Sequence, residues 1–193
     1  AFDRFPILIK FIDASNPLSV QVHPFDDYAY VNENEFGKNE MWYVMDARPG
    51  AFLYCGFSKD TDEAEVRQRI EDGTLPEILN KIPVRKGESY FIETGTVHAI
   101  GPGVLICEIQ QSSNVTYRLY DYKRRDKYGE LRELHVDKAM DVVNFHKKDM
   151  EAAKTMECKY FSVERYDLAE ENSFNLDDSS FRAFVVLEGT GTI

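Results

Sequence analysis

The segment from Gln21 to Pro24 carries two side chains that could bind a metal ion, an amide and an imidazole. Apolar and polar residues alternate over residues 18–23, and this period of two predicts a β-strand. Gln21 and His23 then point to the same face, about 6.6 Å apart along the strand. The apolar residues of the segment would point to the opposite face.

Two further segments offer ligands of the same kind. Residues 37–43 contain Glu40, and residues 95–101 contain His98. A single histidine is more often packed or exposed than bound to metal, but spaced ligand partners favour a site for both histidines. Imidazole and carboxylate groups are common ligands of transition metals. Without Gln21, the two histidines and Glu40 would form the triad that is typical of non-haem iron oxygenases.

The remaining sequence predicts a mainly β scaffold that brings these segments together. Short apolar patterns separated by Gly and Pro turns indicate a β-sandwich or barrel. The predicted strands cover residues 5–14, 18–23, 41–46, 51–56, 82–85, 89–92, 104–110, 115–122, 160–166, 173–176 and 181–187. A small helical excursion is expected between residues 60 and 79, and another helix over residues 134–145.

Composition limits the classes of function. The chain has 193 residues, of which 43% are hydrophobic, so it can bury a core, and no apolar run approaches membrane-spanning length. Its net charge of −11 disfavours nucleic acid and anionic membranes as partners. The odd number of cysteines, Cys55, Cys107 and Cys158, fits a reducing compartment, and we expect a cytoplasmic protein.

The pattern Gly87-x5-Glu93-x-Gly95-x2-His98 resembles the second signature of the cupin family, a small jelly-roll barrel in which the histidine binds metal. This signature is combined with a glutamine at position 21. In this combination the chain resembles the type I mannose-6-phosphate isomerases of that superfamily, in their short bacterial form. The segments that carry this resemblance are residues 18–24, 38–43, 95–101, 108–111, 116–121 and 132–135.

This resemblance implies a zinc-dependent isomerase that interconverts mannose 6-phosphate and fructose 6-phosphate through an enediolate. It implies one zinc ion per chain. The implied ligands are Gln21, His23, Glu40 and His98. The implied catalytic residues are Arg118, Lys38 and Glu108, and the implied substrate-binding residues are Lys10 and Ser19. A charge at Glu108 in an apolar strand is costly unless it is partnered, so this residue is either functional or simply paired.

We expect two units, a metal-binding jelly-roll domain over residues 1–145 and, over residues 146–193, a connector with the incomplete start of a second cupin-like β unit. The expected partner is a phosphorylated hexose, bound by a monomer or a homodimer. Two other functions compete with the isomerase. One is a non-haem iron cupin oxygenase, which Gln21 disfavours, and the other is a non-catalytic sugar-binding cupin, which Lys38 and Arg118 disfavour.

Overall fold

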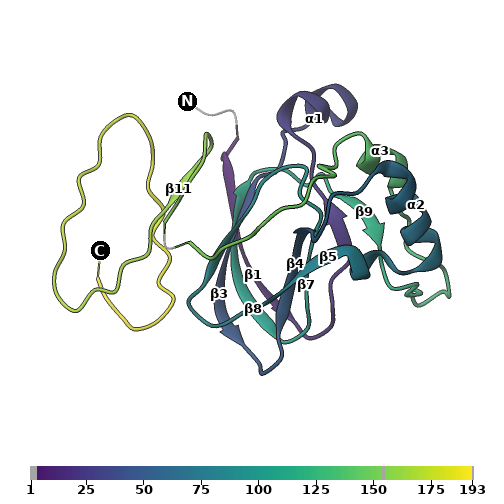
Figure 1. The fold of residues 1–193 in the computed structure, drawn as a ribbon. Coiled ribbons are helices and arrows are strands. Elements are labelled where there is room, and N and C mark those ends of the chain that lie inside the picture. The colour runs from purple at the N-terminus through teal and green to yellow at the C-terminus, as the bar shows by residue number, and fades with distance from the viewer. Residues whose placement is uncertain (1–3, 154, 193) are drawn as a thin grey trace.

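The structure is a computed structural model that describes residues 4–153 and 155–192, and most of the strands in this part lie in two large antiparallel sheets (Figure 1). The first sheet has the strand order β1 (Ile7–Ala14), β8 (Val104–Gln111), β3 (Glu40–Ala47) and β6 (Ser89–Ile92). The second has the order β5 (Leu79–Pro83), β4 (Phe52–Phe57), β7 (His98–Ile100), β2 (Val20–Val22) and β9 (Tyr117–Tyr120). The mainly β fold predicted from the sequence is therefore confirmed.

Both sheets contribute buried apolar side chains to one core between them. Trp42 and Ile106 come from the first sheet, and Leu53 and Ile100 from the second, each at most 3% exposed. Alternation along β8 explains why this core does not fill the whole interior. Val104 and Ile106 are followed on the same face by Glu108 and Gln110, so the far part of β8 presents polar groups to the space between the sheets.

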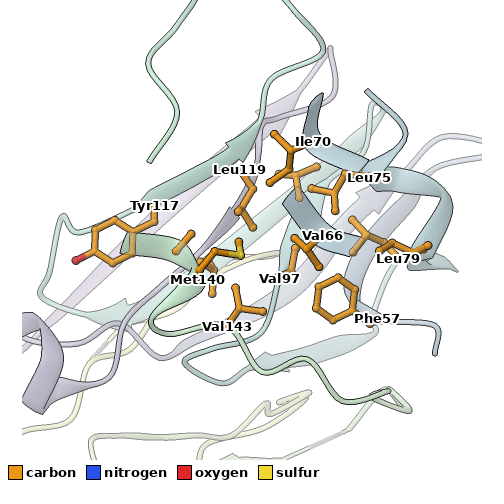
Figure 2. Packing of buried hydrophobic residues seen from close by; sticks show 14 of the residues in the cluster. Phe57, Val66, Ile70, Leu75, Leu79, Val97, Tyr117, Leu119, Met140 and Val143 are labelled. Carbon is orange, nitrogen blue, oxygen red and sulfur yellow. The ribbon is translucent and has the colours of Figure 1, made fainter. Parts of the chain in front are cut away.

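A second core lies on the outer face of the five-stranded sheet, under a helical layer (Figure 2). That layer consists of α2 (Glu63–Asp72), the 3₁₀-helix η1 (Leu75–Ile78) and α3 (Val136–Met140). Val20 and Val22 belong to this core and are fully buried. Strand β2 therefore turns its valines toward the helices, and its polar residues toward the interior between the sheets.

Local sequence signals set the bounds of the helical layer. The Asp62 side chain accepts a hydrogen bond from the Glu65 N–H at 2.8 Å and caps α2, and Gly73 ends it with a φ of 77°. The helix predicted over residues 134–145 is shorter than expected. The Asn144 N–H donates to the Gly95 carbonyl at 2.9 Å, so this part of the chain packs against the turn before β7.

The remaining elements are short. Helix α1 (Asp26–Glu33) follows β2, and β10 (Met156–Glu157) pairs with β11 (Ser162–Val163). The strands predicted at 173–176 and 181–187 are wrong, because described residues 164–192 contain no helix or strand. A strand needs a neighbour for its backbone hydrogen bonds, and these segments pair with none within the described structure.

Residues 164–192 lie on the side of the molecule away from α2 and α3 (Figure 1).

The domain boundary expected at residue 145 stays a prediction. Within residues 4–153 and 155–192, no helix has both the length and the apolar character needed to cross a bilayer.

Candidate metal centre

Gln21, His23, Glu40 and His98 lie together between the two sheets. Gln21 on β2 pairs with His98 on β7, His23 directly follows β2, and Glu40 is the first residue of β3. One ligand atom from each histidine and from Glu40 lies within 4.8 Å of the other two, and all three residues are buried. The Gln21 Nε2 atom lies 3.3 Å from the His98 Nε2 atom. The fold thus gathers the three segments that the sequence singled out.

Both imidazoles present Nε2 to the centre of this group. The Nδ1 atom of His23 lies 3.0 Å from the Val115 carbonyl oxygen, and that of His98 lies 2.7 Å from the Thr96 carbonyl oxygen. A carbonyl can only accept, so each Nδ1 carries the proton and each Nε2 keeps its lone pair. Burial lowers the pKa of His23, and burial with the neighbouring His23 lowers the pKa of His98 to about 3. Both rings are therefore neutral near pH 7, as metal ligation requires.

Glu40 is fully buried, and neither of its carboxylate oxygens accepts an aligned hydrogen bond from any described residue. Burial alone would raise the pKa of this carboxyl, but the nearby His23 and Lys38 outweigh burial and lower it. The Lys38 ammonium lies 2.5 Å from Glu40 Oε1 and 3.2 Å from His23 Nε2. Lys38 is thus close to one carboxylate oxygen without an aligned hydrogen bond to it, and a metal ion between Glu40 and the two imidazoles would give this buried charge a direct partner. These residues therefore fit a metal ion.

A second polar row lies on the four-stranded sheet, which also carries Glu40. The strand register places Lys10, Glu108 and Trp42 side by side on β1, β8 and β3. The Trp42 indole N–H donates to Glu108 Oε2 at 2.9 Å, and Lys10 Nζ lies 3.2 Å from Glu108 Oε1. The Trp42 ring also meets the His98 ring edge-on, with centroids 5.4 Å apart. Glu108 is therefore paired, which offsets the cost of its burial, and its place beside the histidines leaves a functional role open.

Arg118 extends the row of ligands on the five-stranded sheet. Gln21 lies directly opposite His98 on one side and Arg118 on the other, so the three side chains share one face of neighbouring strands. The Arg118 Nη1 donates to the Glu133 carbonyl at 2.8 Å, whereas its buried Nε has no partner among the described residues. Burial and the nearby Arg132 lower the pKa of Arg118. Within the described structure, the Arg118 Nε–H is therefore free to donate to a further acceptor.

The two predicted substrate-binding residues occupy different settings. The Lys10 side chain is 39% exposed, so the polar row on the four-stranded sheet reaches solvent at this residue. Ser19 is buried immediately before β2, and within the described part of the chain no hydrogen bond joins it to the four candidate ligands. Lys10 therefore contacts the polar row at Glu108. Ser19 precedes Gln21 by two residues, and the backbone leading into β2 is what connects it to the candidate ligands.

Sequence reasoning gave no role to several buried amides near the centre. Gln110 receives a hydrogen bond from Lys10, and Gln111 contacts Asn39, the residue between Lys38 and Glu40. The sequence does contain one indication of this role. Two glutamines come at the end of the apolar strand β8, and a buried amide is costly unless it has hydrogen-bond partners. Their partners depend on strand order, which a single sequence does not reveal.

Comparisons with known proteins relate the whole chain to one group of sugar-phosphate enzymes. The chain is 42% identical to mannose-6-phosphate isomerase ManA of Bacillus subtilis over 98% of its own length. It is 46% identical to the mannose-6-phosphate isomerase of Streptococcus mutans over 74% of its length. It spans 64% of the first of these relatives and 45% of the second. No protein-family model matches the chain.

A solved structure agrees with these relatives. The crystal structure of the mannose 6-phosphate isomerase from Bacillus subtilis superposes with a TM-score of 0.74 and 36% identity. The superposition covers 84% of this chain and 52% of that one. The resemblance to mannose-6-phosphate isomerases predicted from the sequence, and the fold class predicted with it, are confirmed.

Proposed function

We propose, on the premise that this chain is a relative of the mannose-6-phosphate isomerases, that it carries the metal-binding part of an enzyme that interconverts mannose 6-phosphate and fructose 6-phosphate. The observation that carries the proposal is the buried group of His23, Glu40 and His98, whose carboxylate lacks aligned hydrogen-bond donors among the described residues. The relatives bear the name of this isomerase, so we assign the reaction to this group.

We infer that the metal is zinc, with one ion per chain. Zinc binds neutral imidazole nitrogens and carboxylate oxygens in four-coordinate sites. Gln21 would supply a further oxygen, because a half-turn of its amide exchanges the oxygen with the nitrogen that lies beside His98. Iron oxygenases instead use two histidines and one carboxylate with open positions, and Gln21 would fill one of these.

The chain's own residues would then handle charge and protons. A bound zinc ion would supply Lewis-acid polarisation of the sugar carbonyl. Isomerisation moves a proton between neighbouring carbons, and negative charge develops on the enediolate oxygens. Arg118 and Lys38 would stabilise that charge, since both cations border the ligand group. Glu108 would take part in proton transfer, with Lys10 and Trp42 orienting its carboxylate.

Substrate binding needs local positive charge, because the chain as a whole carries a net charge of −11. Lys10 is the cation that connects the interior row to solvent, so we assign the phosphate of the substrate to its neighbourhood. Ser19 would add a hydroxyl from the start of β2. This assignment separates the phosphate from the reacting carbons, which would lie near the ligand group.

Elemental analysis and an isomerisation assay on the same purified protein test this proposal. The parent protein should contain one zinc per chain and convert mannose 6-phosphate. The variant His98→Ala should lose most of the zinc, whereas His146→Ala, which removes a histidine with an 85% exposed side chain, should keep it. Iron without isomerase activity would favour the oxygenase instead. Zinc without turnover would favour a sugar-binding cupin, and full zinc in His98→Ala would refute the ligand assignment.

A further inference from the structure

We propose that Asn39, Gln111 and Asp26 are positioning residues that hold the metal ligands in place. This inference rests on the proposed metal site but not on the proposed reaction. The three residues form a hydrogen-bond network that joins all three ligand-bearing segments of the chain. Asp26 follows His23 by three residues, and Asn39 directly precedes Glu40. Gln111 ends β8, the strand that carries Glu108.

The centre of the network is a set of hydrogen bonds between Asn39 and Gln111. The Gln111 Oε1 accepts from the Asn39 backbone N–H at 2.9 Å and from the Asn39 Nδ2 at 2.8 Å. The Gln111 backbone N–H donates in return to the Asn39 carbonyl at 3.1 Å. Asn39 is 8% exposed and Gln111 is 4% exposed, so water cannot easily replace these bonds.

Asn39 also reaches the segment that carries the second histidine. Its Oδ1 accepts from the Thr94 backbone N–H at 3.1 Å, and Thr94 lies in the turn four residues before His98. One side chain therefore fixes the backbone next to Glu40 against the turn that leads into β7. Lys38 and Glu40 alternate with Asn39 along the chain, so the Asn39 amide acts from the side away from the ligand atoms.

Asp26 connects the network to the segment after His23. Its Oδ1 accepts from the Gly37 N–H at 2.9 Å and from the Gln111 Nε2 at 3.1 Å. Gly37 is packed so closely against residues 24–26 that an added Cβ would lie 2.6 Å from the Asp26 nitrogen. The Tyr160 hydroxyl donates to Asp26 Oδ2 at 2.5 Å and links the network to the connection between β10 and β11.

Every polar side-chain atom of Asn39 and Gln111 has a partner in this network, and the partners lie on the ligand-bearing segments or beside them. Hydrogen bonds made directly to metal ligands are typically worth tenfold to a hundredfold in metal affinity. Asn39 and Gln111 act on the ligands through the backbone beside Glu40 and before His98, so we expect a loss at the lower end of this range. A purely structural role would lower stability without a selective effect on metal binding. Metal affinity and stability therefore have to be measured separately.

The test measures zinc affinity by competition with a chromophoric chelator and, in parallel, the melting temperature of each metal-free protein. Asn39→Ala and Gln111→Met should each weaken zinc binding about tenfold. The double variant should bind zinc only slightly more weakly than the weaker-binding of the two single variants, because the two substitutions remove the same contacts. The matched control is Asn80→Ala, which removes an amide that donates to the carbonyls of Cys55, Phe57 and Lys148. It should lower the melting temperature and keep zinc affinity within about threefold.

Equal losses of affinity in Asn39→Ala and Asn80→Ala would overturn the inference, and so would a lower melting temperature in Asn39→Ala with unchanged affinity. If Asn39→Ala does not fold, the same comparison of affinity and melting temperature is made between Gln111→Met and Asn80→Ala. A parent protein that binds zinc but does not isomerise the sugar would refute the proposed reaction and leave this inference standing. A parent protein that binds no zinc would refute both.

Discussion

Replacing Arg118 by alanine removes the cation that lies beside Gln21 on the neighbouring strand. In the structure this guanidinium uses Nη1 for the Glu133 carbonyl, and its Nε is buried without a partner among the described residues. We expect the free part of the guanidinium to meet negative charge on the enediolate. That charge exists mainly in the transition state, so the substitution should lower kcat more than it raises KM.

The magnitude follows from what one directed donor contributes in an enclosed site. Such a donor is typically worth on the order of 3 kcal/mol, or about a hundredfold in kcat. Loss of the Nη1 hydrogen bond to Glu133 should cost about 1 kcal/mol of folding stability, which is small enough for the variant to remain folded. Arg118→Lys should recover only part of the rate, because lysine lacks the planar fork of donors.

Steady-state kinetics of zinc-loaded Arg118→Ala and Arg118→Lys test this role, with Arg125→Ala as the matched control. Arg125 is exposed and donates to the Gly129 carbonyl within its own loop, so its loss should leave kcat within about twofold. If Arg118→Ala keeps kcat within about threefold while KM rises strongly, Arg118 binds the phosphate of the ground state and our reasoning is wrong.

Lys38, Lys10 and Tyr160 make contacts whose removal also has a measurable effect. Lys38→Met should tighten zinc binding about tenfold in chelator competition, because the ammonium no longer lies against Glu40, and should lower kcat; weaker zinc binding would contradict this. Lys10→Ala should raise KM for mannose 6-phosphate about tenfold with zinc content unchanged, and an unchanged KM would place the phosphate elsewhere. Burial and the hydrogen bond to Asp26 raise the pKa of Tyr160 from 10.0 to about 12. The folded protein therefore binds this proton more tightly than the unfolded protein does. Its free energy of unfolding then falls by about 1 kcal/mol as the pH rises from about 10 to about 12. Other tyrosines with raised pKa values, such as Tyr28 and Tyr122, also cause a loss of stability over the same range. Chemical denaturation should therefore show a loss in Tyr160→Phe that is smaller than the loss in the parent protein by about 1 kcal/mol, and equal losses would contradict this.

Local sequence was enough to predict the strand that carries the first ligands. Val20 and Val22 pack against the helical layer, and Gln21 faces the interior, as the alternation requires. The same rule places Arg118 on the interior face of β9, opposite Gln21. These features depend on the two-residue period of a strand and on nothing distant in the chain.

The partners of Glu108 could not be predicted, because they depend on strand order and register. Lys10 lies 98 residues before Glu108, and Trp42 lies 66 residues before it, yet the register makes them immediate neighbours. The network of Asn39 and Gln111 was missed for the same reason. A single sequence shows that these polar residues lie in apolar surroundings, but not which groups satisfy them.

The errors lie where periodicity alone was used. Residues 173–176 and 181–187 have the composition of strands, but in the described structure they have no neighbouring strand to pair with. Residues 142 and 143 are buried as the predicted helix required, yet the chain leaves the helix at Met140 and packs against the turn at Gly95. Apolar spacing therefore predicted burial correctly at residues 142 and 143, but not at residues 173–176 and 181–187, which are mostly exposed. In neither case did it identify the element.

X-ray absorption spectroscopy at the zinc edge of the loaded protein reports directly which atoms bind the metal. The proposed ligand set consists of His23, Glu40, His98 and Gln21. It predicts a first shell of nitrogen and oxygen atoms at about 2.0–2.1 Å, with the outer scattering of two imidazoles. Cys55 lies opposite His98 on the adjacent strand, so a thiolate is the competing ligand in the chain. A sulfur atom at about 2.3 Å, or scattering from fewer than two imidazoles, would contradict the account.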